Sequence, residues 1–321
     1  MPQKPSHKEP EAPASELRKH YYLERYVVIA PRRNLRPDAF KGDRSPHKTE
    51  GAKSPAIEKD RAIFQIKDEA GDWLVKVISN AFPALSLNNP KAYGKQEIVI
   101  ETPKHNTEFS ELPIAQIQRI FDAYSERIES LIKLKDIKHV SVFKNDGPKA
   151  GASIAHAHSQ IIAWPLIPPD VLSEAVVVDE YIEVNQSCPH CDVISWEQEQ
   201  KVRVIYEDKH VIALSPYATR VPFGAWIMPK KHRNSFSTTT ADERQSFAVI
   251  LKKMTALLDQ NMISYNFFLQ NHLAYNNHHF VLRLDPRVSV WAGGEFSTGI
   301  YINIVSPEYA ALWYQGKADK Q

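Results

Sequence analysis

The chain has only two cysteines among 321 residues, no run of about twenty apolar residues, and a formal net charge of just +2. The missing apolar runs predict that no helix spans a membrane, and the N-terminus lacks the apolar core of a signal peptide. The near-zero net charge argues against nucleic acid as a partner, because such proteins carry a dominant basic field. We therefore expect a cytoplasmic protein that acts on small molecules.

The length of the chain is sufficient for one large or two medium domains with a packed core. The first 19 residues are rich in Pro, Glu, Lys and Ser, and this composition predicts a disordered tail.

The two cysteines lie close together as Cys188-Pro-His-Cys191. In a chain without an export signal, this spacing is typical of a metal site or a redox pair. A thioredoxin-like redox motif would need a strand-to-helix junction in a βαβ unit, which the surrounding pattern does not show. A structural zinc ion is the better interpretation, and it requires two further ligands because such sites are closed and tetrahedral.

The most informative segment is Gly151-Ala-Ser-Ile-Ala-His156-Ala-His158-Ser-Gln160, followed by apolar residues. Residues two apart in a strand point to the same face, so we expect the two histidines and Gln160 to share one face. Such a face could supply an imidazole nucleophile for an α-phosphorus and an amide for a phosphate oxygen. The alternative is a polar strand end whose histidines are merely hydrogen-bonded.

The hydrophobic pattern predicts that one unit of strands and a long amphipathic helix occurs twice. The first copy has strands at 73–79, 96–101 and 140–144, a helix over 114–131, and the strand that contains His156. The second has strands at 202–206 and 210–214, followed by the segment 225–232. A helix through 247–258 opened by Thr240 and Asp242, a strand at 264–269 and a strand beginning at His278 complete it.

Overlaying the two copies aligns His105 with His232 and His156 with His279. The second copy therefore supplies two imidazoles that can join the cysteines, and imidazole and thiolate are the ligands that zinc prefers. We predict one structural zinc ion per chain. Its expected ligands are Cys188, Cys191, His232 and His279, with His278 as a competitor for the last place.

The overlay also separates the two copies. The first copy has only Ser45-Pro-His-Lys48 in place of the cysteine pair, and a protonated lysine has no lone pair for a metal. The overlay leaves open whether His105 and His156 bind any metal. Conversely, His158 aligns with Val281, so the second copy lacks a nucleophile there. We expect one catalytic half and one structural half.

With these residues in place, the chain resembles the galactose-1-phosphate uridylyltransferase family, a tandem form of the histidine-triad fold, over about residues 25–311. The resemblance is carried by five segments in the correct order: 30–37, 77–85, 97–105, 151–160 and 292–303. It implies an α+β fold of two histidine-triad-like domains, each an antiparallel sheet with a long packed helix. The implied boundaries are 20–187 for a catalytic domain, 188–315 for a zinc-binding domain and 316–321 for a tail.

The resemblance implies that His158 attacks the α-phosphorus of a nucleotide sugar, and that a second phosphate then accepts the nucleotidyl group. His156 would orient the nucleophile. We expect a backbone carbonyl near His156 to hold the other ring nitrogen of His158, since a neutral imidazole is nucleophilic near its pKa of about 6.5. The implied substrate-binding residues are Gln160, Ser153 and Asn145 for the transferring phosphate, Arg33 and Arg36 for other phosphates, Asn80 and Phe82 for the nucleoside, and Glu295 for the sugar.

The resemblance leaves the substrates open. UDP-glucose with a hexose 1-phosphate is the first expectation, and ADP-glucose with inorganic phosphate is the alternative. Ala157 and Ser159 depart from the uridylyltransferase pattern, and Ser159 together with a zinc site kept in the second half is similar to the ADP-glucose phosphorylase branch. A nucleotide hydrolase and a non-catalytic nucleotide-binding protein are further alternatives. The family also implies a homodimer with sites near the subunit interface.

Overall fold

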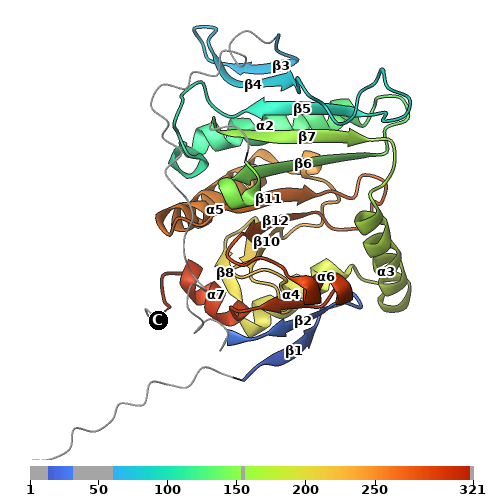
Figure 1. The fold of residues 1–321 in the computed structure, drawn as a ribbon, viewed down its shortest axis with the longest axis vertical. Helices are drawn as coiled ribbons and strands as arrows, with labels where there is room; N and C mark the ends of the chain where they lie inside the picture. The colour runs from blue at the N-terminus through green and yellow to red at the C-terminus, as the bar shows by residue number, and fades with distance from the viewer. Residues whose placement is uncertain (1–13, 32–60, 153–155, 319–321) are drawn as a thin grey trace, which may run out of the picture.

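The computed structural model describes residues 14–31, 61–152 and 156–318. Its main feature is a sheet of ten strands in the order β3-β4-β5-β7-β6-β11-β12-β10-β9-β8, which Figure 1 shows as one continuous series. The strands are β3 (Phe64–Lys67), β4 (Trp73–Ser79), β5 (Lys95–Ile100), β6 (His139–Asp146), β7 (His158–Trp164), β8 (Val204–Glu207), β9 (Val211–Leu214), β10 (Ala225–Pro229), β11 (Tyr265–Gln270) and β12 (Val281–Pro286).

All neighbours in this sheet are antiparallel, and the two halves of the chain meet where β6 pairs with β11. Reading outward from this seam, each half contributes five strands in the same relative order, as a duplicated unit requires. The predicted α+β fold of two antiparallel repeats is confirmed. The structure adds that the two sheets are joined edge to edge.

The helices are α2 (Ile114–Leu131), α3 (Pro169–Asn185), α4 (Pro189–Gln200), α5 (Ala241–Gln260), α6 (Gly293–Thr298) and α7 (Pro307–Tyr314). The two long helices, α2 and α5, are the helices that the apolar periodicity predicts. Thr240 caps α5 by accepting a hydrogen bond from the backbone N–H of Glu243, as its side-chain type favours.

One face of the sheet is covered by α2 and α5, which also contact each other. Their buried apolar side chains form a single core with inward-facing strand residues from both halves, including Val142 of β6 and Phe267 of β11. The strands alternate, so Asn145 and Gln160 point to the opposite, open face. This arrangement places polar residues of β6 and β7 together on the face away from the helices.

The predicted disordered tail is wrong for its last residues, because Glu16–Lys19 form strand β1. This strand pairs with β2 (Tyr26–Ile29), and β2 pairs with β13 (Tyr301–Asn303) in a small separate sheet. Arg18 binds the Glu308 carboxylate at 2.9 Å. Contacts to the C-terminal part of the chain therefore hold the N-terminal segment, a tertiary effect that composition does not report.

In the described parts of the chain, no helix has the length and apolar character needed to cross a bilayer.

Candidate active site and metal centre

The residues of the predicted nucleophilic motif lie at the start of β7, in the middle of the first half's sheet. His158 is the first residue of β7 and pairs with Ile100 of β5, and Gln160 pairs with Ile98 and with Phe143 of β6. His156 precedes the strand, in a bend. The prediction that both histidines belong to one strand is therefore wrong for His156, whose ring has different partners.

The imidazole of His158 is held in one tautomer. Its Nδ1 lies 2.8 Å from the backbone oxygen of His156, and a carbonyl can only accept, so Nδ1 carries the proton. Nε2 is then the nitrogen with the lone pair. The backbone carbonyl that we expected to hold the other ring nitrogen is that of His156. Burial lowers the pKa of His158, and the nearby Lys144 ammonium lowers it further. The ring is therefore neutral, and nucleophilic at Nε2, at neutral pH.

A buried charge network lies beneath His158, on the core face of the sheet. The Lys144 ammonium donates to Glu101 Oε2 at 2.9 Å and to the backbone oxygen of His158 at 3.1 Å. The Ser159 hydroxyl donates to Glu101 Oε1 and also contacts the Tyr124 hydroxyl. The network holds the backbone carbonyl of His158 and the residue that follows it, and Lys144, Glu101, Ser159 and Tyr124 are each less than 3% exposed.

These network residues were missed by sequence reasoning. The available signal was Lys144, a charged residue at a core position of an otherwise alternating strand. A buried lysine of this kind requires a partner, but the sequence does not identify Glu101.

A turn between β6 and β7 lies beside His158. Gly147 has φ of +88°, and a Cβ at this position would lie 2.3 Å from Ser264 Oγ, so no other residue fits without movement. The turn and the histidines enclose a cavity of about 20 Å³, room for about one water molecule. Asn145 borders this cavity, and its Oδ1 accepts a hydrogen bond from Asn266 Nδ2 at 2.8 Å.

Gln160 lies on the same open face and is held by a second amide. Its Oε1 accepts a hydrogen bond from Gln96 Nε2 at 3.0 Å. This contact fixes the orientation of the Gln160 amide and therefore the direction of its NH₂ group. An amide NH₂ donates to phosphate oxygens, so the arrangement suits the predicted role.

His156 is tied to the first half's remaining imidazole. Its Nδ1 lies 3.0 Å from Nδ1 of His105, and its Nε2 lies 2.6 Å from the backbone oxygen of Thr102. The two rings hold each other through this hydrogen bond. The Ser45–Lys48 segment that replaces the cysteine pair lies outside the described residues.

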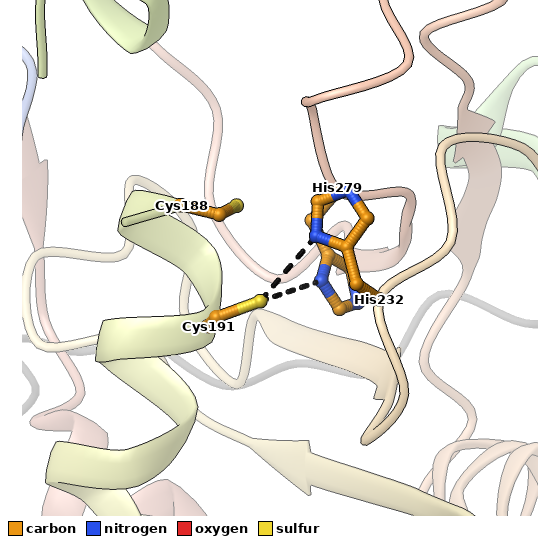
Figure 2. Close-up of side chains that lie close together, drawn as sticks. All are labelled: Cys188, Cys191, His232 and His279. Atoms are coloured by element: carbon orange, nitrogen blue, oxygen red, sulfur yellow. Dashed lines mark hydrogen bonds between the residues drawn. The ribbon is translucent and has the colours of Figure 1, made fainter. Parts of the chain in front are cut away.

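The second half brings the four predicted metal ligands together. Their donor atoms all lie within 4.8 Å of one another, and the Cys191 Sγ atom is 3.4 Å from His232 Nδ1 and 3.5 Å from His279 Nδ1. Figure 2 shows the two cysteines at the start of α4 pointing toward the two histidine rings. His278 points elsewhere and bonds Asp179 at 2.8 Å, so His279 is the histidine that joins the cluster.

The surroundings of the cluster fit a metal ion. The other ring nitrogens of the ligands are bound by backbone carbonyls, His279 Nε2 by Pro229 at 2.9 Å and His232 Nε2 by Asn276 at 3.2 Å. Such contacts orient metal-bound histidines. Hydrogen bonds from Cys191 and the neighbouring histidines lower the pKa of the Cys188 thiol, which favours the thiolate that a metal binds.

The remaining predicted site residues are dispersed. Asn80 follows β4, and its Oδ1 accepts from the backbone N–H of Phe82, whose ring is 93% exposed. Glu295 caps α6 by accepting from the Ala292 N–H, and α6 lies far from β7 within the chain (Figure 1). The structure therefore does not bring Glu295 to His158. Arg33, Arg36 and Ser153 lie outside the described residues.

Comparisons with known proteins identify the family of this chain. The family model for the galactose-1-phosphate uridyl transferase N-terminal domain matches residues 47–168, and a domain of unknown function (DUF4921) matches 113–311. The ADP-glucose phosphorylase of Arabidopsis thaliana is 31% identical over 92% of this chain and 91% of its own. The chain belongs to the galactose-1-phosphate uridylyltransferase family.

Members of this family are nucleotidyltransferases, and so is this enzyme. The galactose-1-phosphate uridylyltransferase of Thermotoga maritima is 29% identical over 72% of this chain and 81% of its own. A crystal structure of an A. thaliana ADP-glucose phosphorylase with bound ADP-glucose is 30% identical, with a TM-score of 0.81 over 94% of this chain and 98% of that chain. The fold and the enzyme class predicted from the motifs are thus confirmed.

Proposed function

We propose that this enzyme transfers a nucleotidyl group from a nucleotide sugar to a phosphate through a covalent intermediate on His158. The observation that carries the proposal is the tautomer of His158, fixed by the backbone oxygen of His156 at 2.8 Å. It leaves the Nε2 lone pair free to attack, in a ring whose pKa is lowered by burial.

In the first step, Nε2 of His158 bonds to the α-phosphorus, and the bond to the sugar-phosphate oxygen breaks, releasing a sugar 1-phosphate. In the second step, an oxygen of the acceptor phosphate attacks the same phosphorus and the phosphorus–nitrogen bond breaks. Gln160 binds a transferring phosphate oxygen, and the Asn145 side chain on the neighbouring strand contacts the same group. Lys144 and Glu101 hold the strand that carries the nucleophile.

ADP-glucose and inorganic phosphate are the proposed substrates, giving glucose 1-phosphate and ADP. The match to an ADP-glucose phosphorylase extends over 92% of the chain, whereas the match to the T. maritima uridylyltransferase extends over 72%. Uridylyl transfer to a hexose 1-phosphate is the second candidate, because that relative is nearly as identical.

The nucleoside is proposed to lie near Phe82, whose exposed ring can stack on a base. Ile78, Ile98 and Ile100 form an apolar cluster beside His158 that extends this surface. Zinc at the cluster of the second half would stabilise the fold and take no part in the transfer. The separation of Glu295 from His158 favours a homodimer in which each copy's Glu295 serves the other's site.

The substrate choice is tested by two assays on the same preparation. Release of glucose 1-phosphate from ADP-glucose and phosphate should have a kcat/KM at least about tenfold above that for UDP-glucose and galactose 1-phosphate. The His158→Ala variant is the control for contaminating activity. A higher kcat/KM for the uridylyl reaction would overturn the choice in favour of the second candidate.

A further inference from the structure

The open face of the sheet carries a second feature, a cavity of about 430 Å³ above β6, β11 and β12. It begins at Asn145, which also borders the small cavity beside His158, and reaches the first turn of α3. Four arginines line it: Arg25, Arg220, Arg283 and Arg287. Two carboxylates, Asp170 and Glu174, also line it, so the charged side chains of the lining leave an excess of two positive charges.

Arg283 is the residue that points to a ligand. It is only 8% exposed, and within the described part of the chain its Nε and Nη2 atoms have no hydrogen-bond partner. The nearest carboxylate oxygen is Glu174 Oε2, 3.5 Å from Nη2, and Asp285 lines an adjoining pocket. Buried donors left unsatisfied in this way are costly, and an anion in the cavity would satisfy them.

The repeat relates Arg283 to a residue of the first half that is also predicted to bind phosphate. His156 aligns with His279, and the same offset aligns His158 with Val281 and Gln160 with Arg283. The second half has therefore lost the nucleophile, but it has a stronger phosphate donor where the first half has the amide of Gln160. A guanidinium fork matches the geometry of a phosphate.

The rest of the lining suits a sugar. Trp164, Phe143 and Phe268 contribute aromatic surface, and the Gln270 Oε1 atom, buried in the wall, also has no partner among the described residues. Aromatic surface beside amides and hydroxyls is the combination that binds sugar rings and their hydroxyl groups. The volume is within the range of small-molecule sites and exceeds what a phosphate ion alone would fill.

We propose that this cavity is a non-catalytic binding site for a phosphorylated sugar, with its phosphate on Arg283. Arg287 and Arg220 complete the phosphate site from the rim, and the sugar lies toward Trp164. The proposal draws on the proposed function only for the choice of glucose 1-phosphate as the probe. It requires no chemistry at His158.

Isothermal titration of glucose 1-phosphate into the full chain tests the site. The rim variant Arg220→Gln/Arg287→Gln should weaken this binding at least about tenfold. The charge-balanced Arg283→Gln/Glu174→Gln variant should do the same, without leaving a buried carboxylate unpaired. The Arg119→Gln variant should bind as the wild type does, since Arg119 lies on α2, on the opposite face.

A crystal of His158→Ala grown with glucose 1-phosphate should show the phosphate within hydrogen-bond distance of Arg283. Thermal unfolding of each variant verifies that it is folded, and the rim variant keeps the test valid if the buried pair does not fold. Unchanged binding in a folded rim variant, or equal affinity for inorganic phosphate and glucose 1-phosphate, would overturn the proposal. Failure of the His158 chemistry is read separately, from labelling of the wild-type protein by ADP-glucose that carries a labelled α-phosphorus.

Discussion

The two halves of this sheet are built on one plan but carry different groups at equivalent positions. In the first half, the strand position of His158 has an imidazole above a buried ion pair, and the neighbouring imidazoles His105 and His156 bond each other. In the second half, the equivalent position is Val281, and the equivalent imidazoles lie with two cysteines in a metal-binding geometry. The comparison teaches that the two copies of one unit place different chemical groups at equivalent positions, a neutral imidazole in the first half and a cluster that could hold a metal ion in the second.

The largest expected effect is that of removing the His158 imidazole from the first half. His158→Ala should lower nucleotidyl transfer by at least about 10³-fold, because no other group supplies the nucleophile. Steady-state assays with ADP-glucose and phosphate measure this loss, and circular dichroism should show an unchanged fold. Val281→His is the matched variant of the second half, and transfer restored by it in the absence of His158 would contradict the division between the halves.

The second prediction concerns the metal. Cys188→Ser should remove the zinc and destabilise the protein by more than about 4 kcal/mol, because a structural metal contributes directly to folding. Elemental analysis should find about one zinc per wild-type chain, and Ser187→Ala, one residue away, should retain it. Two zinc ions per chain would mean that the first half also binds a metal.

The third prediction concerns the buried ion pair under His158. Lys144→Met should lower the free energy of unfolding by about 3–5 kcal/mol, because it leaves Glu101 charged and buried without its partner. Denaturant unfolding measures the loss. Lys144→Met/Glu101→Gln should recover much of the stability, and Lys138→Met at an exposed position should have no effect. Equal losses in the single and double variants would show that the charge is not the cause.

Part of the fold and of the candidate site could be predicted from patterns in the sequence. The spacing of apolar residues predicted the positions of α2 and α5 correctly, because each helix buries apolar side chains along one side. The cysteine spacing and the repeat together predicted the four residues that the structure brings into one cluster. These are local patterns, or patterns repeated in the same order in the two halves.

What the sequence did not reveal depends on contacts between distant segments. The edge-to-edge pairing of β6 with β11 and the Lys144–Glu101 pair join residues that no local pattern relates. Strand β1 depends on its pairing with β2 and on the ion pair between Arg18 and Glu308. Helices α3 and α4 were missed because their apolar residues do not follow one clear stripe.

A smaller effect is expected at the proposed nucleoside surface of the first half. Phe82→Ala should raise KM for the nucleotide sugar about tenfold and change kcat little, because base stacking contributes to binding before the chemical step. Initial rates over a range of ADP-glucose concentrations measure both constants. Val184→Ala, at another exposed apolar side chain, on α3, is the control. An unchanged KM would place the base elsewhere.

The smallest expected effect is on pH dependence. Protonation of Nε2 abolishes attack, and the pKa of His158 is lowered by burial and by Lys144. The neutral form therefore persists as the pH falls, and the acid limb of the transfer rate should lie below pH 6.5. Single-turnover labelling rates between pH 4.5 and 8 give its midpoint, and a midpoint above 6.5 would show that His158 is not the group that titrates.

The central claim is that only the first half performs nucleotidyl chemistry, and one measurement tests it most directly. The protein is incubated with ADP-glucose labelled at the α-phosphorus, quenched in alkali, digested and mapped by mass spectrometry. The account predicts one adenylyl group per chain, on the peptide that contains His158. A label on the peptide that contains His279, or no label from either ADP-glucose or UDP-glucose, would contradict it.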